Sequence, residues 1–172
     1  RFTAEDDRQA AELAGSPKER AENLMIVDMV RNDLGRIAAP GSVEVESLMA
    51  LERYPTVWQM TSTVAARTAA SLPEIFAALF PCASVTGAPK ARTMEWIARL
   101  ERRPRGIYCG AIGWVAPERR AGFSVAIRTL AVTGDRIVMN VGGGLTHGST
   151  ADGEWEEALW KARFVKAAVS RA

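Results

Sequence analysis

The sequence predicts an α+β fold with antiparallel strands. Helical composition marks both ends of the chain, over residues 3–34 and 150–172. Between them, residues 107–141 consist of apolar runs separated by turn residues, and Gly134 and Asp135 form a two-residue hairpin signal. Consecutive hairpins that lie between helices indicate the α+β class with an antiparallel sheet.

Two helices are predicted in the first 35 residues. Residues 3–14 are rich in Ala, Glu and Gln, which favour a helix. A second helix is expected to start at Ser16, which can act as the cap, while Pro17 suits the first helical position and Glu19 can complete a capping box. Gly35 is a natural stop for this helix.

The middle of the chain predicts strands first and helices afterwards. Thr and Val are prominent in the second strand, and the last helix has an amphipathic pattern. Strands are expected over residues 42–51 and 57–64, and a helix over residues 72–80. A loop of small residues at 84–89 and a helix over residues 90–100 follow.

The last third of the chain predicts three strands and a closing helix. The strands are expected over residues 107–115, 123–132 and 136–141. A glycine segment follows at residues 142–144, and the helix is expected over residues 150–172.

Composition describes an ordinary globular chain of 172 residues, which corresponds to one domain or to part of a larger one. Apolar residues make up 48% and charged residues 24%. The formal net charge of +2 is too small to indicate a nucleic-acid or membrane surface. The sequence contains neither an apolar run long enough to span a membrane nor a signal peptide, and it starts with Arg1.

Cysteine and histidine content restricts the possible chemistry. Cys82 and Cys109 lack CxxC spacing and are interpreted as reduced thiols of a cytoplasmic protein. His147 is the single histidine, which excludes a metal site built from several imidazoles. In its Gly- and Ser-rich surroundings, His147 is interpreted as an exposed loop residue rather than a catalytic base.

Two pairs of glutamates have the spacing of one helix face. Glu19 and Glu22 lie three residues apart, and Glu154, Glu157 and Lys161 follow one another at spacings of three and four. Two such pairs suit a hard cation such as Mg²⁺, which prefers carboxylate oxygens. By spacing alone, the alternative of solvated surface groups with a Glu–Lys pair is favoured.

Three further patterns stay open when they are judged from the residues alone. The glycines at 142–144 allow backbone N–H groups to approach an anion, but a tight turn explains them equally well. Arg128 is expected in the middle of a strand, facing either solvent or a site. The basic run of Arg99, Arg102, Arg103 and Arg105 is interpreted as a solvated helix end and loop.

Seven segments together resemble the chorismate-utilising enzymes, a family that includes anthranilate, aminodeoxychorismate, isochorismate and salicylate synthases. The segments occur in the order of the family and cover the chain from about residue 16 to its end. They are AENLMIVDMVRNDLGR (21–36), TSTV (61–64), SVTGAPKARTMEWI (84–97), YCGAIGWV (108–115), SVAIRTL (124–130), VGGGL (141–145) and EWEEALWKA (154–162).

The resemblance implies a fold of two large antiparallel sheets packed together with helices outside. Residues 1–172 would be the C-terminal part of a single chorismate-binding domain, and its N-terminal part would precede Arg1. The resemblance also implies that Glu22 and Glu157 ligate Mg²⁺, while Glu19 and Glu154 support its waters or complete its shell.

The remaining implied site residues contact chorismate, which carries two carboxylates. Tyr108 and Arg128 are expected to hold the enolpyruvyl carboxylate, and Lys161 is expected to face the charged end of the substrate. The substrate is lined by Thr86 and by the backbone N–H groups of Gly142, Gly143 and Gly144. Lys161, Thr86 and Gln59 are the expected catalytic residues.

The sequence around Thr86 resembles that of the family members that aminate chorismate with ammonia to 4-amino-4-deoxychorismate for folate synthesis. Ammonia would come from a glutamine amidotransferase subunit, with an aminodeoxychorismate lyase fused or acting beside it. Gln59 stands where many members have His, which either weakens the anthranilate and salicylate alternatives or means that Gln59 does part of the work by hydrogen bonding. A lysine motif of this group would lie just before Arg1, so the isolated chain is expected to be inactive, and a purely structural module remains a further alternative.

Overall fold

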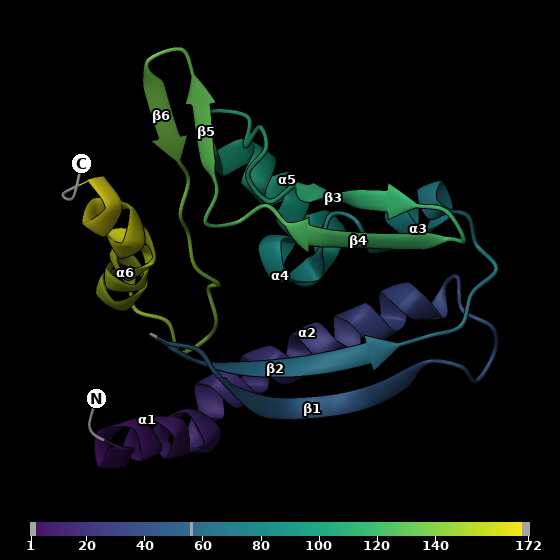
Figure 1. Ribbon diagram of the computed structural model, residues 1–172, viewed down its shortest axis with the longest axis horizontal. Coiled ribbons are helices and arrows are strands. Elements are labelled where there is room, and N and C mark those ends of the chain that lie inside the picture. Colours follow the sequence, from purple (N-terminus) through teal and green to yellow (C-terminus); the bar gives the residue numbers. More distant parts are fainter. Residues whose placement is uncertain (1–2, 56, 170–172) are drawn as a thin grey trace. The chain divides into compact units, whose positions relative to one another are not determined.

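The computed structural model describes the backbone of residues 3–55 and 57–169 and the side chains as far as Arg163 (Figure 1). The chain divides into two compact units, Arg1–Ala83 and Ser84–Ala172. Each unit combines helices with antiparallel strand pairs, which confirms the predicted α+β class. The strands of the described residues form three two-stranded sheets, β1–β2, β3–β4 and β5–β6.

The first unit consists of two long helices, one strand pair and a short helix. Its elements are α1 (Thr3–Gly15), α2 (Pro17–Gly35), β1 (Glu44–Arg53), β2 (Trp58–Ala65) and α3 (Leu72–Leu79). All five correspond to predicted elements, with boundaries that differ by at most two residues.

The start of α2 follows the predicted capping chemistry in part. Ser16 Oγ accepts a hydrogen bond from the backbone N–H of Glu19 at 3.3 Å, and Pro17 occupies the first turn. The backbone N–H of Ser16 donates to the carbonyl oxygen of Leu13, in α1, at 3.2 Å. In a complete capping box this N–H would donate to the side chain of Glu19 instead. The helix ends at Gly35 as predicted.

Antiparallel pairing of β1 and β2 places Gln59 opposite Glu52. The register shifts near Met49, where the backbone adopts φ 55° and its N–H donates to Ser62 Oγ at 2.9 Å. Ser62 Oγ in turn donates to Asn23 Oδ1 at 2.6 Å. These hydrogen bonds connect α2, at the residue that follows Glu22, to β2, the strand that carries Gln59.

The remaining elements lie in the second unit, except that α4 starts at Ala83, the last residue of the first unit. They are α4 (Ala83–Thr86), α5 (Lys90–Leu100), β3 (Ala111–Ala116), β4 (Arg120–Val125), β5 (Leu130–Thr133), β6 (Arg136–Met139) and α6 (Ala151–Val169). The predicted α5 and the predicted hairpin are confirmed, since Thr133 pairs with Arg136 across the two-residue turn. The last three residues of the predicted closing helix, 170–172, lie outside the described residues.

Three sequence predictions about the second unit were wrong. Residues 84–86 are helical rather than a loop, and residues 107–110 form a turn that precedes β3. The strand predicted over 123–132 is two strands, because the chain turns between β4 and β5. There the N–H of Ile127 donates back to the carbonyl oxygen of Val125 at 2.8 Å.

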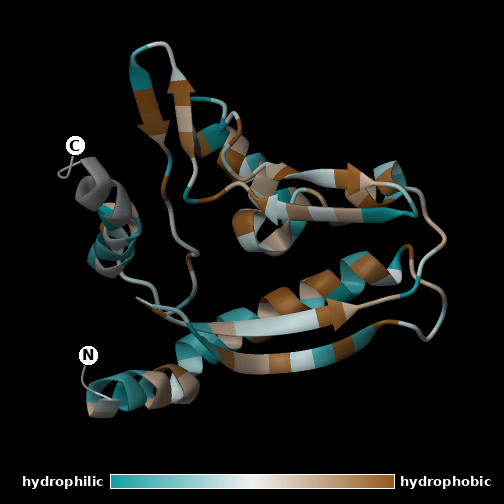
Figure 2. Cartoon of the chain, in the orientation of Figure 1, coloured by the Kyte–Doolittle hydropathy of each residue, from teal (hydrophilic) through white to brown (hydrophobic). Residues whose placement is uncertain are grey.

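Small residues form the buried part of the second unit. Ala126 is 1% exposed, and its backbone bonds to both Cys109 and Gly110. Large apolar side chains of the hairpins stay exposed, among them Trp114, at 58%, and Val132, at 66%. Figure 2 shows hydrophobic residues along both strands of the β5–β6 hairpin. In the described part of the chain, no helix is long and apolar enough to cross a bilayer.

Candidate active site

The side chain of Lys161 connects α6 to the glycine segment. Its Nζ lies 2.6 Å from Oε1 of Glu157, one helical turn earlier, and donates to the carbonyl oxygen of Gly142 at 3.0 Å. The predicted Glu–Lys pair therefore exists, and its ammonium also holds the loop that follows β6. The side chains of Lys161 and Glu157 are 31% and 42% exposed, so a ligand can reach both charges.

Gly143 lies directly against the acidic face of α6. A Cβ atom at this position would lie 2.6 Å from Glu154 Oε2 and 3.8 Å from Glu157 Oε1. A side chain at position 143 would therefore force Glu154 to move. At Gly144, by contrast, a Cβ atom would meet nothing within 4 Å. The glycine requirement of the segment is explained at position 143 by the approach of a carboxylate to the backbone.

Ser149 orients Glu154 from the loop before α6. Its hydroxyl donates to Glu154 Oε1 at 2.5 Å and accepts from the backbone N–H of Thr146 at 3.0 Å. The helix begins after Thr150, whose Oγ1 accepts from the N–H of Gly153 at 3.2 Å. Sequence analysis did not identify Ser149, although a hydroxyl residue just before a predicted helix is a recognisable capping signal.

Tyr108 reaches the same glycine segment from the turn before β3. Its hydroxyl oxygen lies 3.2 Å from the position that a Cβ atom would take on Gly142. The ring is half-buried, and burial is the main cause that raises the pKa of the phenol above its ordinary value. The phenol therefore stays protonated at neutral pH and can donate a hydrogen bond to an anion.

Arg128 lies in the turn between β4 and β5, so the predicted mid-strand position was wrong. Its backbone has φ 50°, in the left-handed region, and its side chain is exposed. The hydroxyl of the next residue, Thr129, donates to the carbonyl oxygen of Ile127 at 2.9 Å and so stabilises this turn. Within the described residues, Arg128 makes no ion pair, so its guanidinium is available to an anion.

Thr86 is the last residue of α4 and is half-buried. The chain then turns at Gly87, whose φ of +106° favours glycine. A Cβ atom on Gly87 would lie 3.2 Å from Cγ2 of Thr93 on α5, so the turn packs closely against the following helix. This packing defines where α4 ends and where Thr86 stands.

The other predicted site residues belong to the first unit. Glu19 and Glu22 lie on α2, and Gln59 is exposed on β2. Lys18 Nζ lies 3.8 Å from Glu22 Oε1, so this carboxylate also has a lysine neighbour on its own helix. Glu22 precedes Asn23, whose amide Nδ2 donates to the carbonyl oxygen of Met60 at 3.4 Å.

The donor chemistry of the predicted metal ligands fits Mg²⁺. All four are glutamates, whose oxygens are the ligands that this cation prefers. Glu19 and Glu22 belong to the first unit, whereas Glu154 and Glu157 belong to the second. Among the described residues, no group of three or more His, Cys, Asp or Glu side chains forms a metal cluster. The ligand set stays a prediction.

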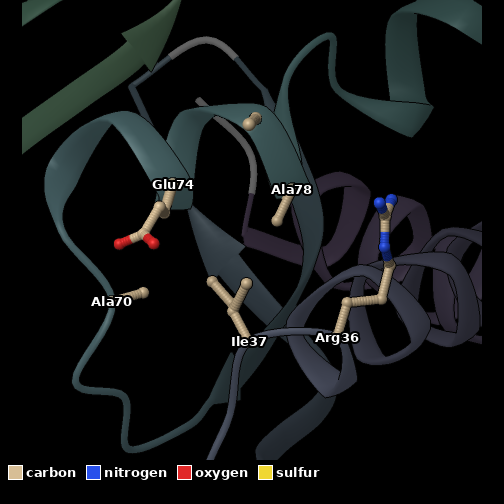
Figure 3. Close-up of a pocket in the computed structure, with 6 residues that line it drawn as sticks. Arg36, Ile37, Ala70, Glu74 and Ala78 are labelled. Atoms are coloured by element: carbon tan, nitrogen blue, oxygen red, sulfur yellow. The ribbon is translucent and has the colours of Figure 1, made fainter.

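A separate pocket of about 420 Å³ lies in the first unit, between the end of α2 and α3 (Figure 3). Its charged lining residues are Arg36 and Glu74. The Glu74 carboxylate already accepts hydrogen bonds from the N–H and the hydroxyl of Ser71, which cap α3. The pocket contains none of the predicted site residues, so its volume alone does not make it the active site.

Comparison with known proteins yields one family. The profile of the family described as chorismate binding enzyme matches residues 1–167. An aminodeoxychorismate synthase from Streptomyces pristinaespiralis is 47% identical over 98% of this chain and 24% of its own length. Anthranilate synthase component 1 from Streptomyces coelicolor is 43% identical over 98% of this chain and 34% of its own length.

A solved structure shares the fold. The crystal structure of anthranilate synthase component I from Streptococcus pneumoniae superposes with a TM-score of 0.81 at 36% identity. The match covers 93% of this chain and 37% of that chain. The present chain thus spans between about a quarter and a little over a third of the length of these proteins.

Proposed function

The chain belongs to the family of chorismate-binding enzymes, and from this membership we propose that it is part of an enzyme that aminates chorismate with ammonia. The product is 4-amino-4-deoxychorismate, in which an amino group replaces the 4-hydroxyl group. The relative at 47% identity, which is named aminodeoxychorismate synthase, supports this choice of product.

The observation that carries the proposal is the cluster of charged and phenolic groups around the glycine segment of the second unit. Lys161 bonds to Gly142, Glu154 closely approaches Gly143, and the Tyr108 hydroxyl faces Gly142. Backbone donors, an ammonium group and a neutral phenol can together bind a small anion that carries a hydroxyl group. Bare glycines leave the backbone accessible to it.

Chorismate carries two carboxylates, and the residues of the chain divide between them. Tyr108 and Arg128 are proposed to bind the enolpyruvyl carboxylate, because a neutral phenol and a guanidinium both donate to it. Backbone N–H groups of the glycine segment and the hydroxyl of Thr86 line the ring. Lys161 stabilises negative charge beside Glu157, and these fixed donors position the substrate before the reaction.

Mg²⁺ is the proposed cofactor, with Glu22 and Glu157 as direct ligands and Glu19 and Glu154 as supporting carboxylates. When bound, the cation neutralises the ring carboxylate and draws electron density toward it, which helps the 4-hydroxyl group to leave. Gln59 stands where many members have His and is proposed to do part of the work of that His by hydrogen bonding, since an amide does not act as an acid or base at neutral pH.

Ammonia is proposed to come from a glutamine amidotransferase subunit, and a lyase would act on the product. The term component 1 in the name of the Streptomyces coelicolor relative fits an enzyme that works with another component. The two cysteines, Cys82 and Cys109, are not joined in a disulfide, which fits a cytoplasmic enzyme.

Anthranilate formation is the second candidate, because relatives with that name reach 43% identity. The test uses the complete protein with chorismate, Mg²⁺ and ammonia. We expect no fluorescent anthranilate, and we expect 4-aminobenzoate to accumulate once an aminodeoxychorismate lyase is added. Anthranilate as the main product would show that the second candidate is correct, and absence of chorismate turnover in the complete protein would contradict both.

A further inference from the structure

We propose that Arg105 is a positioning residue that fixes Tyr108 and the end of α4 relative to each other. It would thereby place two side chains assigned to substrate binding, Tyr108 and Thr86. This inference rests on the proposed function for its kinetic consequence, while its structural basis is independent of the reaction.

The guanidinium of Arg105 forms a fork with Glu101 at the end of α5. Nε donates to Oε2 at 2.9 Å and to Oε1 at 3.1 Å, and Nη2 donates to Oε1 at 2.6 Å. A bidentate pair of this kind fixes the plane of the guanidinium as well as its position. Hydrogen bonding to Arg105 is the main cause that lowers the pKa of Glu101, so the pair stays ionised at neutral pH.

The third nitrogen of the same group reaches α4. Nη1 donates to the carbonyl oxygen of Val85 at 2.9 Å. Val85 precedes Thr86, so this bond holds the backbone next to the threonine hydroxyl. A four-residue helix has too few internal hydrogen bonds to hold itself in place, and an external donor at its end compensates for them.

The same guanidinium also lies over the ring of Tyr108. The Cζ atom of Arg105 is 5.8 Å from the centroid of the tyrosine ring, a distance at which cation–π attraction operates. The backbone N–H of Tyr108 also donates to the carbonyl oxygen of Arg105 at 3.1 Å. Since the tyrosine hydroxyl lies beside Gly142, the position of Arg105 determines how that hydroxyl meets the glycine segment.

Burial separates Arg105 from its basic neighbours. Its side chain is 25% exposed, whereas Arg102 and Arg103 are exposed. The interpretation of the whole run as a solvated helix end was therefore wrong for Arg105. Lysine cannot make these contacts together, because an ammonium group has no planar fork and no extended face to stack.

The test compares three variants of the complete protein: Arg105→Met, Arg105→Lys and the control Arg103→Met. For Arg105→Met we expect the KM for chorismate to rise roughly tenfold or more, with kcat less affected. The reason is that the variant loses charge-assisted hydrogen bonds that hold a substrate-binding group in position. Arg105→Lys should recover only part of this loss, and Arg103→Met should match the wild type. A purely structural role would lower thermal stability and leave the KM unchanged, which would overturn the inference.

Coupling to Tyr108 is tested by combining Arg105→Met with Tyr108→Phe. Because both changes affect one hydroxyl group, the rise in KM caused by Arg105→Met should be clearly smaller in the Tyr108→Phe background. Fully additive effects would contradict the proposed coupling.

A second measurement does not depend on activity. Fluorine NMR of the complete protein labelled with 3-fluorotyrosine contains a Tyr108 signal, which is identified by its loss in Tyr108→Phe. That signal should shift or broaden in Arg105→Met and Arg105→Lys and stay in place in Arg103→Met. An unchanged signal in both Arg105 variants overturns the inference, whereas a shifted signal in a protein that does not bind chorismate supports it and rejects only the proposed function.

Discussion

Lys161 and Glu157 form an ion pair of 2.6 Å on α6, and the same ammonium donates to the carbonyl oxygen of Gly142. The pair thus links a helix face to a loop that lies 19 residues earlier in the chain. A Glu–Lys pair on an exposed helix contributes only about 0.3–0.5 kcal/mol to stability, so the value of this contact lies in the geometry that it gives to the glycine segment.

Replacing Glu157 with Gln should weaken Mg²⁺ binding by at least about tenfold, because one carboxylate charge disappears while the shape of the side chain is nearly kept. Calorimetric titration of the complete protein with Mg²⁺ measures this change. Glu156→Gln is the matched control, since Glu156 is the exposed neighbour on the same helix. Equal affinities in both variants would show that Glu157 is not a ligand.

Gly143→Ala should damage the site, whereas Gly144→Ala should not. The new methyl group at 143 would lie 2.6 Å from Glu154 Oε2, and at 144 it would meet nothing within 4 Å. The carboxylate of Glu154 is the far end of a flexible side chain and can move, but moving it strains its bond to Ser149, so we expect a loss of only about 0.5 kcal/mol in stability and a clear decrease in Mg²⁺ affinity. Thermal unfolding and calorimetry check both effects, and similar behaviour of the two variants would contradict the proposed contact.

Arg128→Lys should reduce kcat/KM for chorismate by an amount equivalent to about 1.5–3 kcal/mol, because an ammonium group cannot bind a carboxylate in bidentate fashion. Steady-state kinetics and Mg²⁺ titration of the complete protein separate the effect on substrate from the effect on the metal site. Arg136→Lys serves as the control on the exposed β5–β6 hairpin. Kinetics of Arg128→Lys that equal those of the control would mean that Arg128 contacts only solvent.

The pair of Glu101 and Arg105 should make the protein more stable at neutral than at acidic pH. The fork lowers the pKa of Glu101 below its ordinary value of 4.5, so its contribution is present above the unfolded-state pKa. This contribution is lost as the pH falls through the lowered value. The difference in melting temperature between the wild type and Glu101→Gln should therefore shrink between pH 7 and pH 3. A difference that stays constant over this range would indicate that the carboxylate charge does not matter.

The sequence alone determined the features that depend on near neighbours. The cap at Ser16, the end of α2 at Gly35 and the two-residue turn at Gly134 are set by residues within one helical turn or one hairpin, so local rules predicted them. The joint order of seven motifs also determined the family, which the family profile confirms.

Resemblance proposed a set of site residues but gave no information about how they are arranged. Resemblance named Tyr108, Glu154, Glu157 and Lys161, and the structure brings them to the same glycine segment. Resemblance did not identify Arg105, because a basic run in a sequence has the same appearance whether its members are solvated or buried.

Only the tertiary structure decided the features that join distant parts of the chain. Ala126 bonds to Cys109 and Gly110, and the strand predicted through Arg128 ends there in a turn. Arg105 meets Val85 across 20 residues, and Glu154 meets Gly143 across 11. Local pattern carries no signal for such contacts, because their free energy arises from packing and hydrogen bonds between segments that have no fixed spacing in sequence.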